Sequence, residues 1–378
     1  MPGSGHVVVA PDKFKGSLTA PQVAGHVAAG LRRGRPDVRV VTLPVADGGD
    51  GTVDCAVAGG FSRVPAVVRG PTGEPVTASF AVRGSVAIIE AAQACGLRRL
   101  PGGIPAPLTA TSYGAGELIV AAAAAGARRI VLGLGGVACT DGGAGMVAAL
   151  GGRLLDRAGK PLPPGGAALR TLDRLDLTGL RGHRKTTALP GVIVACDVDN
   201  RLLGPDGAAA VYGPQKGATP GEVAALDAGL ARWADVAEQA LGRRCRDRPG
   251  SGAAGGLGFA ALAFLGAGMR PGIDVLLETL GFARHIKGAR LAITGEGSLD
   301  AQTLRGKAPA GVARAAAAAG VPVAAIAGVS ELTTAGLRRI GITAAYTLAG
   351  IQPDLRRCMT DAGPLIEDLA ERLAQEWL

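Results

Sequence analysis

Aromatic residues are scarce in this chain of 378 residues, where Phe, Trp and Tyr together make up 3%. No cluster of them lies in a basic stretch, so a stacking platform for single-stranded nucleic acid is not expected. The formal net charge is +9, which favours anionic partners in general. The arginines are scattered, with local groups at 32–35 and 243–248, and we interpret both groups as solvated surface.

Cysteine is sparse as well: the sequence holds six, and no two of them form a C-x-x-C pair. This dispersal excludes the usual zinc-binding frameworks and predicts reduced thiols. The N-terminal residues pass directly into an apolar run, 7–10, without the pattern of a signal peptide. We therefore expect a cytoplasmic protein.

An uninterrupted apolar run long enough to cross a membrane is missing too. The most apolar stretch, 253–269, contains five glycines and is too short for a membrane helix. The phosphate-binding motif G-x-x-x-x-G-K-[ST] is also absent, which excludes a P-loop nucleotide site. The sequence therefore predicts neither a membrane partner nor a nucleic-acid partner.

What the sequence does have is the β-α-β rhythm of an α/β protein. Apolar strands alternate with helices at both ends of the chain, whereas residues 64–90 show the short alternating strands of an antiparallel meander. A chain of this length is expected to form two domains. We predict that residues 1–70 and 285–378 build a doubly wound, Rossmann-like α/β domain. Residues 71–284 would form an inserted second α/β domain, with the active site in the interdomain cleft.

The stretch 294–307 has an unusual content for a connection. It follows the apolar run 289–293 and precedes an alanine-rich helix, so we expect a strand-to-helix loop, where α/β proteins bind ligands. Acids that suit a metal stand beside bases that suit phosphate, which is the chemistry of phosphoryl transfer. The polar side chains of this stretch are Glu296, Ser298, Asp300, Gln302, Thr303, Arg305 and Lys307.

Two further strand–loop–helix units lie near the N-terminus. Lys13, Lys15 and Ser17 precede a predicted helix over 20–33, whose N-terminus favours anions. Two solvated lysines are an equally good explanation of that loop. In the acidic glycine loop that follows, Asp47 and Asp50 could serve as general base or metal ligand. A helix N-cap explains Asp50 well and Asp47 less well.

The middle of the chain adds more candidates. A glycine loop with Gly135, Gly136 and Asp141 follows a strand, as in phosphate-binding loops. A dinucleotide-binding Rossmann motif is disfavoured there, because no acid ends the next strand at the required spacing. Asp197 ends a buried strand, a good position for a metal ligand or a base. Lys216 lies between Gln215 and Gly217 and could contact phosphate, although a turn-rich connection would explain this region too.

One acid in the middle of the chain stays ambiguous. Glu90 closes an apolar strand and precedes a helical patch. It could face a pocket, and a salt-bridged position at the edge of the core is as good an explanation.

Eight segments occur together in the order and at the intervals found in one family. They are Ala10–Leu18, Ala46–Thr52, Ala110–Glu117, Gly133–Gly145, Ala195–Asn200, Gly213–Gly217, Gly252–Gly258 and Thr294–Lys307. In this set the sequence resembles the bacterial glycerate kinases of the type I family, over about residues 5–375. The resemblance implies a two-domain α/β fold in which ATP and glycerate meet, with Mg²⁺ bridging the phosphates. It also implies phosphorylation of D-glycerate, commonly at the 2-hydroxyl to 2-phosphoglycerate, with 3-phosphoglycerate as the alternative product.

The resemblance and the chemistry of the loops together give a candidate site. The expected catalytic residues are Lys13, Asp47, Asp197, Asp300 and Lys307. The expected substrate- or phosphate-binding residues are Lys15, Ser17, Gly135, Gly136, Asp141, Lys216, Gln302 and Arg305. The expected Mg²⁺ ligands are Asp197, Glu296 and Asp300. The expected partners are ATP and a small hydroxy acid, and the protein would be a monomer or a homodimer.

The sequence departs from the family's usual Gly-Gly-Ser-Ala-Thr-Asn-Asp-Gly-Gly at Val137, Cys139 and Thr140, and Arg201 replaces a usual proline. A buried substrate group that loses a hydrogen-bond partner costs about 1–3 kcal/mol. A kinase for a different hydroxylated acceptor is therefore one alternative. A non-catalytic ligand-binding relative is another, and the nucleotide-type loops alone would also permit an NAD-dependent dehydrogenase.

The expected site predicts the effect of two substitutions. Asp197→Asn and Lys307→Ala should each lower kcat by roughly tenfold or more, since each removes a charged side chain that is expected to act on the transferring phosphoryl group or its metal ion. The measurement is a steady-state assay on variants whose circular dichroism matches the wild type. Wild-type turnover in both variants would reject this site.

Overall fold

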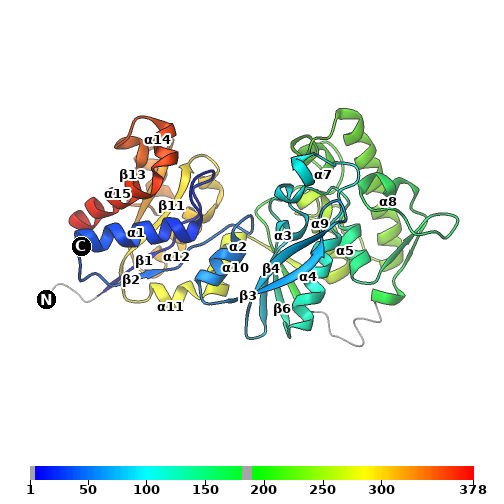
Figure 1. The fold of residues 1–378 in the computed structure, drawn as a ribbon, viewed down its shortest axis with the longest axis horizontal. Helices are drawn as coiled ribbons and strands as arrows, with labels where there is room; N and C mark the ends of the chain where they lie inside the picture. The colour runs from blue at the N-terminus through cyan, green and yellow to red at the C-terminus, as the bar shows by residue number, and fades with distance from the viewer. Residues whose placement is uncertain (1–4, 181–189) are drawn as a thin grey trace. The chain divides into compact units, whose positions relative to one another are not determined.

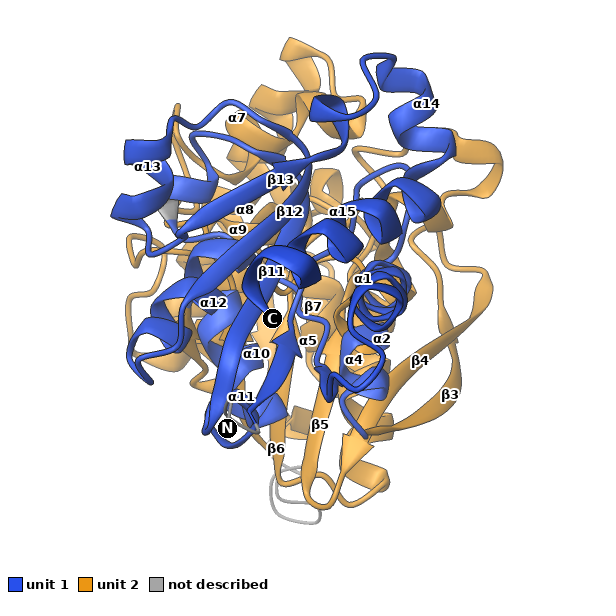
Figure 2. Ribbon diagram, turned by 90° about the vertical axis from the view of Figure 1, so that its left-hand side faces the viewer, with its two compact units in different colours: residues 1–47, 54–60, 271–378 blue, residues 48–53, 61–270 orange. Residues whose placement is uncertain are grey.

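The computed structural model describes residues 5–180 and 190–378, apart from the side chain of Arg305. The chain divides into two compact units, coloured separately in Figure 2. Unit 1 comprises Met1–Asp47, Asp54–Gly60 and Pro271–Leu378, and unit 2 comprises Gly48–Val53 and Phe61–Arg270. These limits differ from the expected division after residues 70 and 284, and each unit is described by itself.

Unit 1 is built on a five-stranded parallel sheet. The strand order is β13-β12-β11-β1-β2, so β1 from the start of the chain pairs with β11 from its final third. The bounds are β1 His6–Val9, β2 Val40–Thr42, β11 Ala289–Leu299, β12 Val323–Ser330 and β13 Ala344–Thr347. Parallel pairing brings the carboxyl ends of β1 and β11 to the same edge of the sheet.

Two long helices cover one face of this sheet, α1 (Ala20–Gly34) and α15 (Ala362–Trp377). In Figure 2 they lie on one side of the strands, and α12 (Ala308–Ala317) lies on the other. The predicted cap of α1 is confirmed, because Thr19 accepts a hydrogen bond from the Gln22 amide in a capping box. The other helices of unit 1 are α2 (Thr52–Ala58, from its third residue), α10 (Gly272–Leu280), α11 (Phe282–Ile286), α13 (Thr334–Arg339) and α14 (Leu355–Thr360).

Unit 2 contains a six-stranded mixed sheet in the order β10-β9-β6-β5-β4-β3. The predicted meander is confirmed: β3 (Ser62–Arg69), β4 (Pro75–Arg83) and β5 (Val86–Glu90) pair antiparallel. The strands β5, β6 (Arg129–Gly133), β9 (Gly191–Ala195) and β10 (Gly268–Arg270) pair parallel. A separate antiparallel pair is formed by β7 (Arg153–Leu155) and β8 (Arg174–Asp176). The predicted α/β class with parallel sheets is therefore confirmed.

Helices of varied length surround the sheet of unit 2 (Figure 1). They are α3 (Ala92–Cys95), α4 (Tyr113–Ala124), α5 (Ala144–Ala149), α7 (Ala208–Tyr212), α8 (Pro220–Leu241) and α9 (Ala253–Ala260). Trp233 of α8 is fully buried and stacks on Phe264, with ring centroids 5.4 Å apart. Among the helices of residues 5–180 and 190–378, none combines the length and hydropathy needed to cross a bilayer.

The expected loop at 294–307 was wrong in its first part. β11 continues to Leu299, because Gly295, Glu296 and Ser298 pair with β12. A Cβ on Gly295 would lie 2.0 Å from the carbonyl oxygen of Ile326, so only glycine permits this close pairing. Gly295 and Gly297 are therefore part of a strand, which carries Glu296 to the carboxyl edge of the sheet.

Two glycines of α1 predict opposite effects on stability. A Cβ on Gly30 would lie 2.2 Å from the carbonyl oxygen of Glu367 in α15, whereas a Cβ on Gly25 meets nothing within 4 Å. Gly30→Ala should destabilise the fold by about 1–3 kcal/mol through overpacking. Gly25→Ala should stabilise it by about 0.5–1 kcal/mol through helix propensity. Urea denaturation measures both, and equal effects of the two variants would contradict the packing of α1 on α15.

Candidate functional site

Two buried acids meet at the carboxyl edge of the unit 1 sheet. Asp12 follows β1 and is 6% exposed, and Glu296 near the end of β11 is 7% exposed. The amide of Asp12 donates to the carbonyl oxygen of Gly295 at 2.8 Å, which ties the two chain segments together. This edge is where open α/β sheets bind ligands.

Asp12 is held by its neighbour Lys13. The Lys13 amide donates to Asp12 Oδ1 at 2.6 Å, and Lys13 Nζ lies 3.6 Å from the same oxygen. Burial raises the pKa of Asp12 to about 6, the charge of Lys13 opposes this shift, and the charge of Asp47 adds to it. The structure therefore brings the predicted residues Lys13 and Asp47 into electrostatic range of one buried carboxyl group.

Glu296 belongs to a second, connected group. The Thr303 hydroxyl, itself fully buried, donates to Glu296 Oε1 and accepts from the Asp300 amide at 3.1 Å. Asp300 Oδ1 in turn accepts from the amides of Gln302 at 2.7 Å and Thr303 at 3.2 Å. Burial raises the pKa of Glu296 to about 7; Thr303 and Lys307 oppose the shift, and Asp12 and Asp300 add to it.

Four predicted residues of unit 1 thus lie in one electrostatic group with Glu296 and Asp12: Lys13, Asp47, Asp300 and Lys307. Two residues of this group were missed as site residues from the sequence, Asp12 and Thr303. The signal for Asp12 was its place directly after a buried strand, and Thr303 stood among the polar residues of 294–307. Lys15 and Gln302 are exposed, and Ser17 donates to the carbonyl oxygen of Phe14 at 3.3 Å. The Arg305 side chain lies outside the described part of the structure.

A second group forms at the carboxyl edge of the parallel strands in unit 2. The segment Gly48–Val53 lies against the ends of β6 and β9: a Cβ on Gly133 would lie 2.4 Å from Gly48 O, and one on Gly48 2.6 Å from Ala195 O. The Gly135 amide donates to Gly48 O at 3.3 Å. Three predicted regions therefore converge here, namely the acidic glycine loop, the glycine loop after β6, and the strand end that precedes Asp197.

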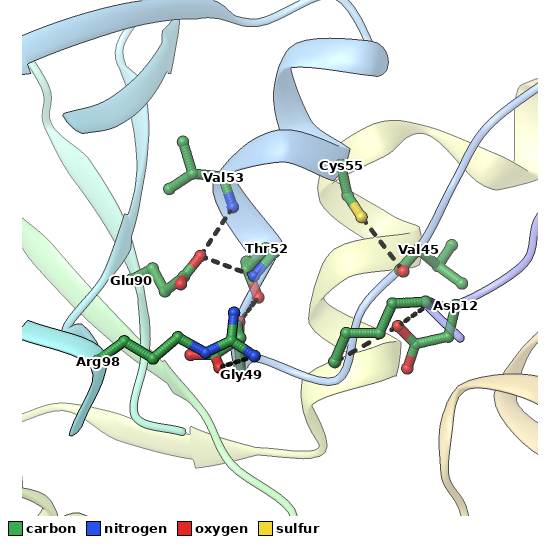
Figure 3. A network of polar contacts seen from close by, with 11 residues as sticks. Asp12, Val45, Gly49, Thr52, Val53, Cys55, Glu90 and Arg98 are labelled. Carbon is green, nitrogen blue, oxygen red and sulfur yellow. Dashed lines mark hydrogen bonds and ion pairs between the residues drawn. The ribbon is translucent and has the colours of Figure 1, made fainter. Parts of the chain in front are cut away.

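Polar side chains of unit 2 flank this segment. Figure 3 shows the carboxylate of Glu90 facing the amide of Val53, and Arg98 beside the turn at Gly49. Arg98 forms an ion pair with Asp50 at 3.7 Å, and Asp50 Oδ1 would lie 2.7 Å from a Cβ on Gly136. Asp197, two residues beyond β9, is exposed.

Asp141 is buried in unit 2, with 1% exposure. Its carboxylate accepts five hydrogen bonds, from the amide and hydroxyl of Ser112, the hydroxyl of Thr111, and the amides of Gly143 and Gly145. These donors lie at the N-terminal ends of α4 and α5. Asp141 therefore joins two helix starts to the glycine loop.

Lys216 is 3% exposed and lies beneath the same loop. Its Nζ donates to the carbonyl oxygen of Cys139 at 2.5 Å and to the Thr140 hydroxyl at 3.4 Å. Burial lowers the pKa of Lys216, and the neighbouring Cys139 and Asp141 act in the opposite direction. The ammonium group of Lys216 therefore binds the glycine loop, and the predicted phosphate contact stays a prediction.

The residues that depart from the family's usual glycine loop face the interior of unit 2. Val137 is 3% exposed, and Cys139 and Thr140 are fully buried. A hydrogen bond with Cys95, together with burial, raises the pKa of the Cys139 thiol well above its usual range. These three side chains therefore pack in the core, which argues against direct selection of a substrate by them.

No group of three or more His, Cys, Asp or Glu side chains suited to a metal ion occurs within residues 5–180 and 190–378. Mg²⁺ does not require such a group, since it keeps water ligands and binds one or two carboxylates together with substrate phosphates. Glu296 and Asp300, linked through Thr303, have this chemistry. Burial makes the charged form of Glu296 costly, and a bound cation would offset that cost.

The raised pKa of Asp12 predicts a pH-dependent stability. Between roughly pH 4 and 6 the folded protein retains a proton that an unfolded Asp, with its pKa of 3.8, has released. The free energy of unfolding should therefore fall as pH rises through this window. Asp12→Asn removes the effect, so the variant should gain up to roughly 3 kcal/mol over wild type at pH 7.5 and little at pH 4.

Urea denaturation at the two pH values measures this difference. Asp37→Asn, at an exposed position of unit 1, is the control and should show no such pH dependence. An Asp12→Asn variant that is destabilised equally at both pH values would contradict the burial of an unfavourable charge at this position.

Comparisons with known proteins all identify the same protein family. Residues 7–378 match the sequence profile of the Glycerate kinase family. Glycerate kinase of Bacillus subtilis is 45% identical over 371 residues, covering 97% of this chain and 96% of its own. Glycerate 2-kinase of Escherichia coli is 43% identical over 346 residues, covering 90% of each chain. A crystal structure from Salmonella typhimurium LT2, provisionally assigned as glycerate kinase 2, superposes with a TM-score of 0.86 at 40% identity, covering 99% of this chain and 98% of that one. This chain therefore belongs to the glycerate kinase family.

Proposed function

We propose that this protein transfers the γ-phosphoryl group of ATP to a hydroxyl group of D-glycerate, giving 2-phosphoglycerate. The observation that carries the proposal is the pair of buried acids, Asp12 and Glu296, with lysines beside them at the carboxyl edge of the unit 1 sheet, in a chain of this family. The similarity to the glycerate 2-kinase of Escherichia coli favours the 2-hydroxyl over the 3-hydroxyl.

Phosphoryl transfer depends on positioning and on charge stabilisation, because the chemistry itself needs little from the protein. Lys13 and Lys307, which act electrostatically on Asp12 and Glu296, would bind the oxygens of the transferring group. As the new O–P bond forms and the bond to ADP breaks, the substrate hydroxyl loses its proton. We assign that proton to the Asp12–Asp47 pair, since Asp12 with a pKa of about 6 is charged at neutral pH and still basic enough to accept it.

Mg²⁺ would be held by Glu296 and Asp300 of unit 1. Asp300 Oδ1 accepts from two amides and Glu296 Oε1 from the Thr303 hydroxyl, so both carboxylates are held in place and would supply oxygen ligands to the ion. When bound, the ion would neutralise charge on the phosphate oxygens. The metal and catalytic roles expected for Asp197 stay predictions from the family resemblance.

The remaining expectations stay proposals of the same kind. Contacts of Lys15, Ser17, Gly135, Gly136, Asp141, Lys216, Gln302 and Arg305 with substrate or phosphate are inferred from the resemblance. We also propose that the two compact units correspond to two domains, that unit 1 is a doubly wound Rossmann-like domain, and that the protein is a cytoplasmic monomer or homodimer.

A kinase for another hydroxylated acceptor is the second candidate. Its support is the departure at Val137, Cys139 and Thr140. The burial of these side chains favours D-glycerate instead, because a packed side chain affects substrate choice only through the loop that it supports.

The proposal predicts acceptor-dependent ADP release. With Mg-ATP, D-glycerate should give a higher kcat/KM than L-glycerate or other small hydroxy acids, and ³¹P NMR should identify the product as the 2-phosphate. Glu296→Gln and Lys13→Ala should lower kcat/KM by roughly a hundredfold, as expected for groups that stabilise the transition state. Phosphorylation of a different acid alone would reject D-glycerate, and no ADP release with any acceptor would favour a ligand-binding role.

A further inference from the structure

Glu90 is a buried acid that the proposed chemistry does not use. It is the last residue of β5 and is 3% exposed. Its Oε2 accepts hydrogen bonds from the amides of Gly51 at 3.1 Å and Val53 at 3.3 Å. Figure 3 shows the carboxylate on the β5 side of the segment Gly48–Val53, aimed at the start of α2.

These two bonds serve amides that have no intrahelical partner. The first amides of a helix lack an acceptor, and leaving one unsatisfied in a buried place is costly. Bonds of a charged acceptor are stronger than those of a neutral one. Thr52 forms a hydrogen bond within the segment, in which its hydroxyl donates to Gly49 O at 2.6 Å. Glu90 therefore binds the segment to the sheet of unit 2 at its C-terminal half.

The N-terminal half of the segment is held in a different way. There a Cβ on Gly48 would lie 2.6 Å from Ala195 O, and a Cβ on Gly135 would lie 2.5 Å from Gly49 Cα, so these backbones approach too closely for a side chain. Such contacts fix position only if the rest of the segment stays against the sheet. The carboxylate of Glu90 and the glycine contacts thus act together on one short peptide that carries Asp50 and directly follows Asp47.

We propose that Glu90 is a positioning residue for the phosphoryl transfer, acting through the segment Gly48–Val53. Its carboxylate fixes the position of Asp50 within the segment and of the backbone that directly follows Asp47. Misplacement of a catalytic group by about 1 Å can cost about a hundredfold in rate, so the loss of two hydrogen bonds here is expected to affect kcat. The inference rests on the proposed function only in its kinetic part.

The test compares variants of two glutamates of unit 2 whose carboxylates accept hydrogen bonds from backbone amides. Glu90→Ala removes the acceptor, and Glu90→Gln keeps an oxygen acceptor at the same length. Glu117→Ala is the matched control. Glu117 Oε2 accepts a hydrogen bond from the Arg69 amide at 2.6 Å, and neither residue belongs to the segment 48–53. Each variant is examined by kcat and KM for ATP and D-glycerate, by melting temperature, and by amide hydrogen exchange over 48–53.

Glu90→Ala should lower kcat by about tenfold or more, change either KM less, and speed amide exchange in 48–53. Glu90→Gln should keep kcat within about threefold of wild type, and Glu117→Ala should leave both kcat and exchange in 48–53 unchanged. If Glu90→Ala does not fold, Glu90→Asp takes its place, since the shorter side chain cannot reach both amides and should lose more kcat than Glu90→Gln.

If Glu90→Ala shows faster amide exchange in 48–53 but the kcat of the wild type, the positioning role is overturned and the proposed function stays intact. Equal losses in Glu90→Ala and Glu117→Ala would assign the effect to stability alone and also overturn it. If the wild type phosphorylates no acceptor, the proposed function fails, and the exchange measurement still decides whether Glu90 holds the segment.

Discussion

The burial of two carboxyl groups at one sheet edge is the constraint on which the rest of unit 1 depends. Asp12 follows β1 and Glu296 lies on the neighbouring parallel strand β11, and withdrawal from water raises the pKa of each carboxyl group, to about 6 and about 7. A fold that keeps such groups loses stability unless charge of the opposite sign is near. Lys13 and Lys307 supply part of that charge, and a metal–nucleotide complex would supply more. The same arrangement therefore lowers the stability of the free protein, and under the proposed function it would favour binding of a polyanion that carries a cation.

The strand ends of unit 2 are built from closely packed backbone loops. Loops rich in glycine pack against one another so closely that side chains are excluded, as at Gly48 and Gly133. Buried charged side chains then hold these glycine-rich backbone segments in place. Asp141 binds the starts of two helices, and Lys216 binds the glycine loop. The result is a set of short, well-defined backbone segments at the edge of a parallel sheet, which suits a site that depends on position more than on reactive side chains.

The sequence predicted much of the fold because its signals are local. The capping box at Thr19 and the alternation in residues 64–90 each report on a few adjacent residues, and both are confirmed. The end of β11 was missed because glycines usually mark loops, and only pairing with β12 shows that Gly295 is required in a strand. Long-range packing of this kind has no local signal.

The candidate site was predictable in part for the same reason. Acids and lysines beside strand ends pointed to Lys13, Asp47, Glu296, Asp300 and Lys307. A sequence alone does not distinguish a solvent-facing lysine from a buried one, so it did not show that Lys216 is buried and that its ammonium group supports a loop. Asp12 and Glu90 each stand at or just after the end of an apolar strand, but that position did not decide their roles, which depend on amides and charges from other parts of the chain.

The most direct measurement of the central claim is the pKa of Glu296 in the free protein and with a non-hydrolysable Mg-ATP analogue bound. Carboxyl ¹³C NMR can follow it, with Glu296→Gln used to assign the signal. The account predicts a value near 7 in the free protein and a clear fall when the complex binds, because the cation favours the charged form. An ordinary value in the free protein, or no change on binding, would contradict it.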